Sequence, residues 1–475
     1  MSLPERFKER MTLLLGEDEA KALFCAIEDS DAVKAFRING IKTDKEAFER
    51  SEPAIDRKSV DFPPDAYLTR EEFPGSFPAH HSGAIYIQDV SAMSTVYAVT
   101  LKEGMRVLDS CSAPGGKTTQ LAAAVGESGI VVANEYDRKR CRVLQGNVER
   151  MGCKNTVVCN LDTAVLAETY SSDFDLVLCD APCSGEGMFR KNPRAVEEWS
   201  EENVTMCAER QREILENVAR CVKTGGRLVY STCTFSTEEN EQNVAWFLDT
   251  HTDFELVDAE RALIEHTSDG IMIEESTYDM KKCRRIYPHL SLGEGQFIAV
   301  FKRVGEDCPE AFPRGEDVAQ RQMRGKKMKG SAEKKKNRDE LDALNTAREF
   351  LKENLTCEPS GELVLLGDLI FLSPEIELPP YNVFATGVCV GEWQKGRIIP
   401  HHQLFSAFGR DFKARLELEG KSADAEKYLR GEEIDAVDAD GASGWCAVMI
   451  DGCATGGGKI SGGKCKNHYP KGLRE

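Results

Sequence analysis

The chain has 475 residues, more than one hydrophobic core usually supports, so we expect about three domains. A composition of 41% hydrophobic and 30% charged residues is typical of a globular protein, and no apolar run approaches the roughly 18 residues that a membrane helix needs. The N-terminus has no apolar signal core, so we expect a cytoplasmic protein. A formal net charge of −19 argues against broad, unspecific binding to nucleic acid but leaves room for a local basic face.

The 17 cysteines are scattered along the chain without a Cys-x-x-Cys pair, and there are only 8 histidines. The spacing typical of zinc sites is absent, so we predict that no metal is bound. In a reducing compartment most of these cysteines are expected to be buried thiols that pack like small apolar residues. Only cysteines in a special setting are candidates for chemistry.

The N-terminal part is predicted to be helical over roughly the first 50 residues, because its apolar residues recur at helical spacing. It ends in a short strand-like segment, 36–42, in which Arg37 and Lys42 could contact phosphate. Solvated surface charge is the alternative interpretation of this pair. Residues 51–80 are rich in proline and mixed charge, and we expect them to be a connecting segment.

A pattern of strand, loop and helix repeats from Met105 onward. The first loop, 109–117, contains Gly115 and Gly116, which allow the backbone to approach a ligand closely. A helix predicted to begin near Thr118 would point its N-terminal N–H groups at that ligand. The loop has neither the Walker spacing nor the G-x-G-x-x-G spacing, so alone it does not identify the ligand.

Acidic residues follow the next two predicted strands. Glu135 ends the strand 129–134, where it could accept hydrogen bonds from a ribose diol. Asp162 follows the strand 156–159 and could reach the edge of an adenine. Each acid alone is typical of a strand-end turn, but together with the glycine loop they predict a nucleoside-type cofactor.

The next two strands carry the residues around which the chain is organised. Short apolar runs, 174–178 and 226–230, are separated by a long helical segment, which indicates neighbouring parallel strands. Asp180 and Cys183 follow the first strand, and Cys233 follows the second. Because ligands bind where the strands of open α/β sheets end, we expect these three side chains to lie at one rim.

Several features complete this region. Between the two strands, the segment 185–191 is predicted to be a flexible loop with a basic tip, Arg190 and Lys191. A helix over about residues 201–222 would complete the crossover, and a late strand, 297–301, is predicted near the edge of the sheet.

The C-terminal part is basic in two places. The segment 321–338 holds nine Lys or Arg and one Glu, which predicts a mobile linker that could add phosphate contacts. A helix over about 341–354 and frequent short strands then predict two small α+β modules. The basic, glycine-rich tail, 456–474, predicts an RNA-contacting surface, with a plain hairpin as the alternative. The candidate contacts are Lys459, Lys466 and Lys471.

Three motifs carry a resemblance to a known family: Cys-Ser-Ala-Pro-Gly-Gly-Lys at 111–117, Asp-Ala-Pro-Cys-Ser-Gly-Glu-Gly-Met-Phe-Arg-Lys at 180–191 and Ser-Thr-Cys-Thr-Phe-Ser at 231–236. With them the chain resembles the bacterial 16S rRNA cytosine-C5 methyltransferase F family of the NOL1/NOP2/Sun group. The resemblance extends to the segments 36–39 and 467–474, and Ser112 stands where the family usually has Ala.

The resemblance implies an α/β fold: a Rossmann-like S-adenosylmethionine-dependent methyltransferase domain with a small helical/α+β N-terminal extension and α+β C-terminal modules, the last PUA-like. The expected parts are an N-terminal RNA-binding extension, 1–95; the methyltransferase domain, 96–305; a basic linker, 306–340; an α+β module, 341–420; and a PUA-like RNA-binding module, 421–475. The implied partner is 16S rRNA or the small ribosomal subunit, and we expect a monomer with no membrane partner.

The resemblance also assigns roles to residues of this chain. Cys233 is expected to be a nucleophile that adds to carbon 6 of cytosine, with Cys183 assisting product release and Asp180 contacting the ring. The residues expected to bind S-adenosylmethionine are Cys111, Ser112, Ala113, Pro114, Gly115, Gly116, Lys117, Glu135, Arg140, Asp162 and Asp180. The residues expected to bind RNA are Arg37, Lys42, Arg190, Lys191, Lys459, Lys466 and Lys471.

Other activities remain as alternatives. Enzymes that methylate exocyclic amines typically carry Asp/Asn-Pro-Pro-Tyr/Phe after the fourth strand, where this chain has Asp-Ala-Pro-Cys. The same carbon-5 chemistry could act on tRNA instead of rRNA. A non-catalytic RNA-binding factor in ribosome assembly is a third possibility, which the intact cysteines and Asp180 argue against.

Overall fold

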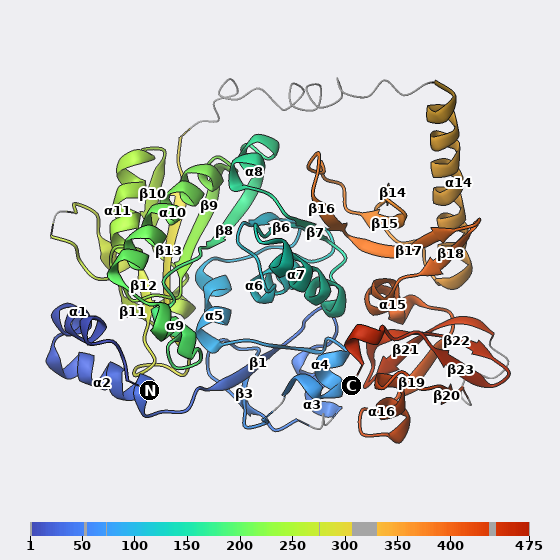
Figure 1. Ribbon diagram of the computed structural model, residues 1–475, viewed down its shortest axis with the longest axis horizontal. Helices are drawn as coiled ribbons and strands as arrows, with labels where there is room; N and C mark the ends of the chain where they lie inside the picture. Colours follow the sequence, from blue (N-terminus) through green and yellow to red (C-terminus); the bar gives the residue numbers. More distant parts are fainter. Residues whose placement is uncertain are drawn as a thin grey trace.

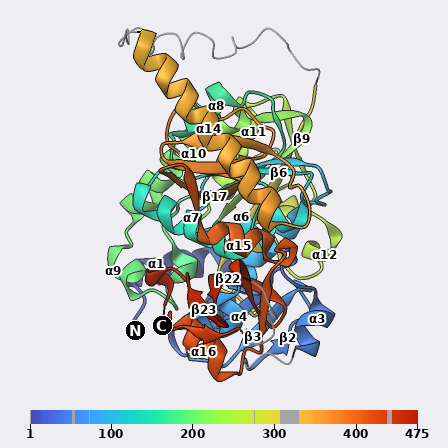
Figure 2. The ribbon, with the colours of Figure 1, turned by 90° about the vertical axis from the view of Figure 1, so that its right-hand side faces the viewer.

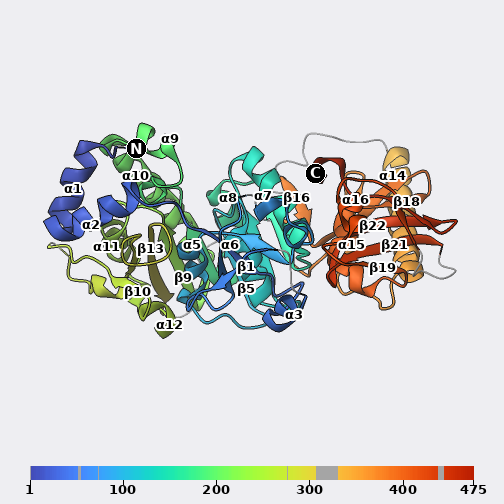
Figure 3. The same cartoon turned by 90° about the horizontal axis from the view of Figure 1, so that it is seen from below.

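The computed structural model describes residues 2–51, 55–72, 74–274, 276–305, 330–436 and 443–474. Seen from below, the molecule is elongated (Figure 3). Helices α1 (Glu5–Leu15) and α2 (Glu17–Glu28) lie at one end, a large sheet lies in the middle, and the C-terminal strands lie at the other end.

The central sheet has ten strands in the order β11-β12-β13-β9-β8-β5-β6-β7-β16, with β10 paired to β13. Strands β5 to β9 run parallel to one another, and the outer strands are antiparallel to their neighbours (Figure 1). The strands are β5 (Arg106–Asp109), β6 (Ile130–Asn134), β7 (Thr156–Cys159), β8 (Phe174–Asp180), β9 (Val222–Thr232), β10 (Phe254–Val257), β11 (Ser268–Asp269), β12 (Arg284–Ile286), β13 (Gln296–Arg303) and β16 (Val383–Thr386).

Alternating residues of the parallel strands enter two separate cores, one on each face of the sheet. Val107 and Leu176 pack with α6 (Gly116–Ala124) and α7 (Arg138–Met151). Their chain neighbours Leu108 and Val177 pack on the other face, with α8 (Thr163–Thr169), α10 (Glu201–Ala219) and α11 (Glu241–Thr250). Burial on both faces explains the near-continuous apolar runs from which these strands are predicted. The expected parallel pairing of β8 and β9 is confirmed.

The late strand lies near the edge of the sheet, as predicted, but it is not the outermost strand. β13 pairs with β9 on one side and with β10 and β12 on the other. The outer strands are only two to four residues long, so their apolar pattern is too short to predict them. The strand predicted at 297–301 is therefore present near the edge of the sheet, with short strands beyond it that the sequence does not predict.

The N-terminal extension forms a small antiparallel sheet in the order β2-β3-β1-β4. Its elements are β1 (Lys34–Ile38), α3 (Lys45–Arg50), β2 (Lys58–Ser59), β3 (Ala66–Thr69), α4 (Pro78–His81) and β4 (Ile85–Ile87), followed by α5 (Val90–Ser94). The segment predicted as a mere connection, 51–80, therefore contributes two strands of this sheet. Phe7 of α1 packs edge-on against Phe189 and Trp199, beside one of the two cysteine motifs.

The C-terminal part contains two antiparallel or mixed sheets linked by α15 (His402–Phe408). The first has the order β14-β15-β17-β18, and α14 (Gly330–Asn354) lies across it (Figure 2). Its strands are β14 (Glu362–Leu366), β15 (Leu369–Ser373), β17 (Val388–Gln394) and β18 (Arg397–Pro400). The second sheet and its helix consist of β19 (Arg415–Leu418), α16 (Ala423–Leu429), β20 (Ile434–Asp435), β21 (Gly444–Ile450), β22 (Cys453–Ser461) and β23 (Lys464–Asn467).

The expected domain limits stay predictions, although two pairings cross them. β16 leaves the module expected at 341–420 and pairs with β7 of the central sheet. β19 ends before residue 421 but pairs with β21 in the last sheet. The first part of the basic segment 321–338 lies outside the described residues, and the chain is helical from Gly330, which is earlier than the sequence suggests. That end of the segment is therefore not the mobile linker that its composition predicts.

Within the described ranges, no helix is both long and apolar enough to cross a membrane. In the same part of the chain, His, Cys, Asp and Glu form no group of three that could hold a metal ion.

Two residues predicted to contact RNA are instead buried between parts of the chain. Arg37, only 1% exposed, donates hydrogen bonds to the Gly116 carbonyl and the Thr119 hydroxyl of α6, at 2.8 and 2.7 Å. Lys42, 4% exposed, donates to the carbonyls of Ser406 and Ala454 in the C-terminal part. The phosphate contacts expected for these two residues are therefore wrong; the side chains join the extension to its neighbours.

Replacing Lys42 by Met is expected to destabilise the protein by about 2 kcal/mol, because two buried carbonyls lose their donor. Urea unfolding followed by fluorescence would measure the loss. The exposed Lys45 is the matched control, and Lys45→Met should leave the unfolding free energy almost unchanged. A Lys42→Met variant with unchanged stability but weaker RNA binding would restore the phosphate-contact interpretation.

Candidate active site

The glycine loop joins the end of β5 to the start of α6. Gly115 adopts a left-handed conformation, with φ +108°, that favours glycine. Ser112 and Thr118 brace the loop by donating from their hydroxyls to the Asp109 carbonyl, at 2.7 Å, and to the Asp109 carboxylate, at 2.6 Å. These two hydrogen bonds give the loop a fixed shape. The contact of Cys111 with Cys179, together with burial, raises the pKa of the Cys111 thiol.

Asp109 was not singled out by sequence reasoning. Its side chain is fully buried beneath the loop, and burial raises its pKa to about 7. Its position at the end of a strand, just before the glycine motif, could have marked Asp109 as a site residue. The sequence does not show that its side chain is buried.

The acidic residues of the next strands lie along the same edge of the sheet. Glu135 follows β6, and its carboxylate accepts the Asp137 N–H at 2.8 Å and lies 3.5 Å from the Arg140 guanidinium. Arg140 also donates to the Ala113 carbonyl, at 2.8 Å, and so connects Glu135 to the glycine loop. Asp162 is exposed after β7 and caps α8 through the Ala164 N–H. The donors and carboxylates at this edge suit a cationic nucleoside such as S-adenosylmethionine.

The two motif cysteines meet although 50 residues separate them in sequence. The Sγ atoms of Cys183 and Cys233 lie 3.2 Å apart, and the Cys233 N–H points to the Cys183 sulfur at 3.3 Å. Asp180 stands at the end of β8, where its carboxylate accepts from Lys117 Nζ at 2.7 Å and from the Ser231 hydroxyl at 2.6 Å. The structure thus brings together the residues predicted for catalysis and one end of the glycine loop.

Two groups at this site, the Cys183 thiol and the Lys117 ammonium group, have raised pKa values for different reasons. The hydrogen bond with Cys233, together with burial, raises the pKa of the Cys183 thiol. Either sulfur of the pair can be the donor of this hydrogen bond. Burial acts to lower the pKa of Lys117, but the Asp180 carboxylate outweighs burial and the Cys233 sulfur adds to its effect, so the pKa is raised. Lys117 is therefore a permanent ammonium group that is paired with Asp180 and interacts electrostatically with Cys233.

Two buried glutamates hold the cysteine loops in place. Glu186 accepts hydrogen bonds from the Phe235 N–H at 2.9 Å and the Ser236 hydroxyl at 2.7 Å, and so joins the two motifs. Glu239 accepts from the Ser184 N–H at 3.0 Å and from Gln211 at 2.7 Å. Glu186 lies inside a recognised motif and Glu239 follows another, but only the structure shows that both are buried.

The basic tip of the 185–191 loop does not face outward as expected. Arg190 is nearly buried and pairs with Glu294 at 2.9 Å, so the phosphate contact predicted for it is wrong. Lys191 is partly exposed and pairs with Asp89 at 2.7 Å; its contact with RNA stays a prediction. The exposed Lys459, Lys466 and Lys471 lie in the C-terminal sheet and tail, and their contacts also stay predictions.

Comparisons with known proteins match almost every part of this architecture. Residues 3–90 match the N-terminal domain of 16S rRNA methyltransferase RsmF, 96–302 match 16S rRNA methyltransferase RsmB/F, and 415–475 match the methyltransferase RsmF PUA domain. The ribosomal RNA small subunit methyltransferase F of Vibrio cholerae serotype O1 (strain M66-2) is 30% identical over 100% of this chain and 98% of its own length. The chain belongs to the 16S rRNA methyltransferase RsmB/F family. It is therefore an rRNA methyltransferase of an S-adenosylmethionine-dependent family, with an RsmF-type N-terminal domain and a C-terminal PUA domain.

Other members and solved structures agree with this assignment. The RsmB/F relative of Shewanella sediminis (strain HAW-EB3), also named ribosomal RNA small subunit methyltransferase F, is 32% identical over 84% of this chain and 80% of its own. A methyltransferase homologue from Pyrococcus horikoshii has 30% identity and a TM-score of 0.56, covering 63% of this chain and 95% of that one. NSun6 from the same organism, at 22% identity and a TM-score of 0.55 over 64% of this chain and 99% of its own, shows the shared fold. The Rossmann-like methyltransferase fold is thus confirmed.

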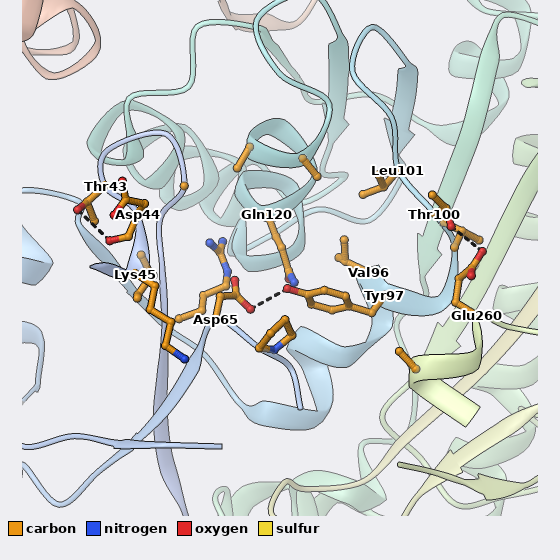
Figure 4. A pocket seen from close by; sticks show the side chains of 18 residues that line it. Thr43, Asp44, Lys45, Asp65, Val96, Tyr97, Thr100, Leu101, Gln120 and Glu260 are labelled. Atoms are coloured by element: carbon orange, nitrogen blue, oxygen red, sulfur yellow. Dashed lines mark hydrogen bonds between the residues drawn. The ribbon is translucent and has the colours of Figure 1, made fainter. Parts of the chain in front are cut away.

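A cavity of about 650 Å³ lies elsewhere in this RsmB/F protein, between the N-terminal domain and α6 (Figure 4). Its wall includes Tyr97, whose hydroxyl donates to Asp65 at 2.7 Å, and Gln120 of α6. None of its 18 lining residues belongs to the cysteine motifs or the glycine loop. The site chemistry therefore does not depend on it.

The stability of the loops should depend on pH through Glu239. Burial raises the pKa of Glu239 from 4.5 to about 7. The folded form thus holds its proton to a higher pH than the unfolded chain does, so this contribution to stability is complete below pH 4.5 and is lost as the pH rises to about 7. In Glu239→Gln, the fall in unfolding free energy over this range should shrink by on the order of 2–3 kcal/mol.

Denaturant titrations at a series of pH values would measure this change. Glu238→Gln is the matched control, because Glu238 is partly exposed and pairs with Arg10. The pKa of Asp109 is also raised to about 7, so the unfolding free energy of both variants should still fall with rising pH over this range. An unaltered pH profile in Glu239→Gln would show that Glu239 is ionised throughout.

Proposed function

We propose that this enzyme methylates carbon 5 of a cytidine in 16S rRNA through a covalent bond between Cys233 and carbon 6 of the base. The observation that carries the proposal is the 3.2 Å contact between the Cys183 and Cys233 sulfurs, beside the Lys117–Asp180 ion pair. Simple methylation of an exocyclic amine would require neither thiol.

The reaction needs a nucleophile because carbon 5 of cytosine is itself poorly nucleophilic. S-adenosylmethionine would supply the electrophilic methyl group. When the Cys233 thiolate adds to carbon 6, carbon 5 would become an enamine-like carbon that attacks the methyl group. The bond between this methyl group and the sulfonium sulfur would break, and the neutral thioether S-adenosylhomocysteine would leave. Loss of the carbon-5 proton then lets the electron pair reform the ring double bond while the bond from sulfur to carbon 6 breaks. Cys233 is returned as a thiolate, so atoms and charge balance over the cycle.

The neighbouring side chains have distinct roles in this scheme. Lys117 would favour the thiolate of Cys233 by its charge. Asp180 would hydrogen-bond N3 or the exocyclic amine of the base and stabilise charge that develops on the ring. Cys183 would assist the loss of the carbon-5 proton, as a base or by positioning a water molecule. The target base must be unpaired or flipped out of a helix to reach these groups.

The cofactor would lie along the carboxyl edge of β5 to β8. The loop 111–117 would approach it by its backbone, and Glu135, with Arg140 beside it, is placed at the end of β6 for a ribose diol. Asp162 and Asp180 would complete the site at the ends of β7 and β8. We further propose that the protein works as a monomer in the cytoplasm, on 16S rRNA or on the small subunit.

Cys233→Ala is expected to reduce transfer of labelled methyl from S-adenosylmethionine to 16S rRNA at least about a thousandfold, because the carbon-6 adduct cannot form. Naked 16S rRNA, small subunits and tRNA would be tested in parallel. Cys25→Ala, at an exposed cysteine of α2, is the control and should be fully active. Full activity of Cys233→Ala would exclude the proposed nucleophile, and activity on tRNA alone would exclude the proposed substrate but not the chemistry.

Cys183→Ala is expected to accumulate a protein–RNA adduct that survives denaturant, because the bond to Cys233 forms but its elimination is slow. Denaturing gels with labelled RNA would detect the adduct. The double variant Cys183→Ala/Cys233→Ala should form none. An adduct that persists in the double variant would mean that another residue makes the bond.

Lys117→Met should slow alkylation of Cys233 by iodoacetamide at neutral pH about tenfold, because a Cys233 thiolate would lose the favourable charge of Lys117. Peptide mass spectrometry would follow Cys233 separately from the other thiols. Lys191→Met is the comparison, since Asp89 and Glu294 already hold its charge. Equal rates in wild type and Lys117→Met would remove Lys117 from the account of thiolate formation.

A further inference from the structure

A row of three side chains crosses the C-terminal sheet. Trp445 on β21 lies opposite Lys459 on β22, which in turn lies opposite Lys466 on β23. Residues directly opposite one another in antiparallel strands point to the same face of the sheet. An indole ring and two ammonium groups therefore stand side by side on one face.

Only part of this face is covered. Phe405 of α15 packs against the strand at Gly457, where an added Cβ would lie 2.5 Å from the phenyl ring. Beyond this contact a cavity of about 820 Å³ opens between the two C-terminal sheets. Its lining includes Trp445, Lys459, Lys466, His468, Phe350 of α14 and Arg397 of β18.

Among the described residues, the two lysines of the row have no acidic partner. Within the part of the chain that the structure describes, neither Lys459 nor Lys466 forms an ion pair, whereas Lys464 of the same strand pairs with Asp435. Like charges directly opposite each other destabilise a sheet. In a chain of net charge −19, such a pair is best explained by an anionic ligand that offsets the repulsion.

Trp445 is held in a fixed position. Its ring lies 4.6 Å from the His468 imidazole, edge to face, and 6.1 Å from the Phe405 ring. Burial, together with Lys466 and Lys459, lowers the pKa of His468, so the imidazole is neutral. Lys459 Nζ lies 5.5 Å from the indole centroid. Because this side chain is exposed and flexible, it can leave the ring and follow an anion.

We propose that this cavity binds one unpaired nucleotide of a single-stranded RNA segment, with its base stacked on Trp445 and its flanking phosphates beside Lys459 and Lys466. An aromatic platform next to unpaired cations is the usual arrangement for single-stranded nucleic acid. Glu349 and Glu353 line the cavity from α14, which leaves the lysine side for the phosphates. The inference rests on the proposal that the substrate is RNA, and it adds a second contact far along the chain from Cys233.

The test uses the full-length protein and a short fluorescent oligouridylate, which lacks the cytidine that the active site would take. Fluorescence anisotropy should show that Trp445→Leu weakens binding about tenfold and that Trp445→Phe retains most of the affinity. Lys459→Gln/Lys466→Gln should lower the slope of log affinity against log salt by about 1.4, as expected for two phosphate contacts. Lys427→Gln, which removes a charge already paired with Asp424, is the control and should change neither quantity.

A short RNA duplex should bind equally well to wild type and Trp445→Leu, because its bases are already stacked. The proposal is overturned if the Trp445 and double-lysine variants both bind oligouridylate as wild type does, or if Trp445→Leu loses duplex binding to the same extent. Should Trp445→Leu fail to fold, the double-lysine variant decides. Cys233→Ala should bind oligouridylate normally, so failure of the proposed methylation chemistry and failure of this site give different results.

Discussion

The register between β8 and β9 is the constraint on which the site depends. The two strands are parallel, and Asp180 lies opposite Ser231, so both cysteine loops leave the sheet at the same edge. A slip of one residue would turn every side chain of one strand to the other face and would separate the motifs. The register is fixed because alternate residues of both strands are buried in different cores. The contact between the two sulfur atoms thus depends on how the residues of β8 and β9 pack in the two cores, at a distance from the site.

Buried charges stabilise the loops only because their hydrogen bonds are satisfied. Arg285 and Glu241 form an ion pair whose side chains are 2% and 0% exposed, and Arg285 also donates to the Phe235 carbonyl of the second cysteine loop at 2.8 Å. Glu186 acts in the same way from the other side. Isolated buried charges would cost far more than they contribute, but a fully bonded group defines one conformation. Hydrogen bonds from these buried groups therefore hold the cysteine loops, and with them the two thiols, in one conformation.

Much of the central domain was predictable from the sequence, for physical reasons. Strands buried on both faces appear as continuous apolar runs, and motif residues at their ends must lie at one edge of a parallel sheet. The burial of three charged side chains could not be predicted from the sequence. Arg37, Lys42 and Arg190 have the composition of surface cations, but each is buried against acceptors from distant segments. Their partners come from distant parts of the chain, so no local pattern could identify them. The short strands beyond β13 were missed for the opposite reason, because each has too few residues to form a pattern.

The attachment of the C-terminal part has a consequence for how RNA would be chosen. β16 adds to the central sheet beside β7, and the buried Lys42 joins the N-terminal domain to Ser406 and Ala454. The C-terminal part is thus attached on two sides, by β16 to the central sheet and through Ser406 and Ala454 to the N-terminal domain, and its placement does not rely on the peptide connection alone. If RNA binds as proposed, a segment that reaches the thiols would also have to present its second contact at a set separation from the target base. Three-dimensional shape of the RNA, more than the sequence around the target, would then decide which cytidine is methylated.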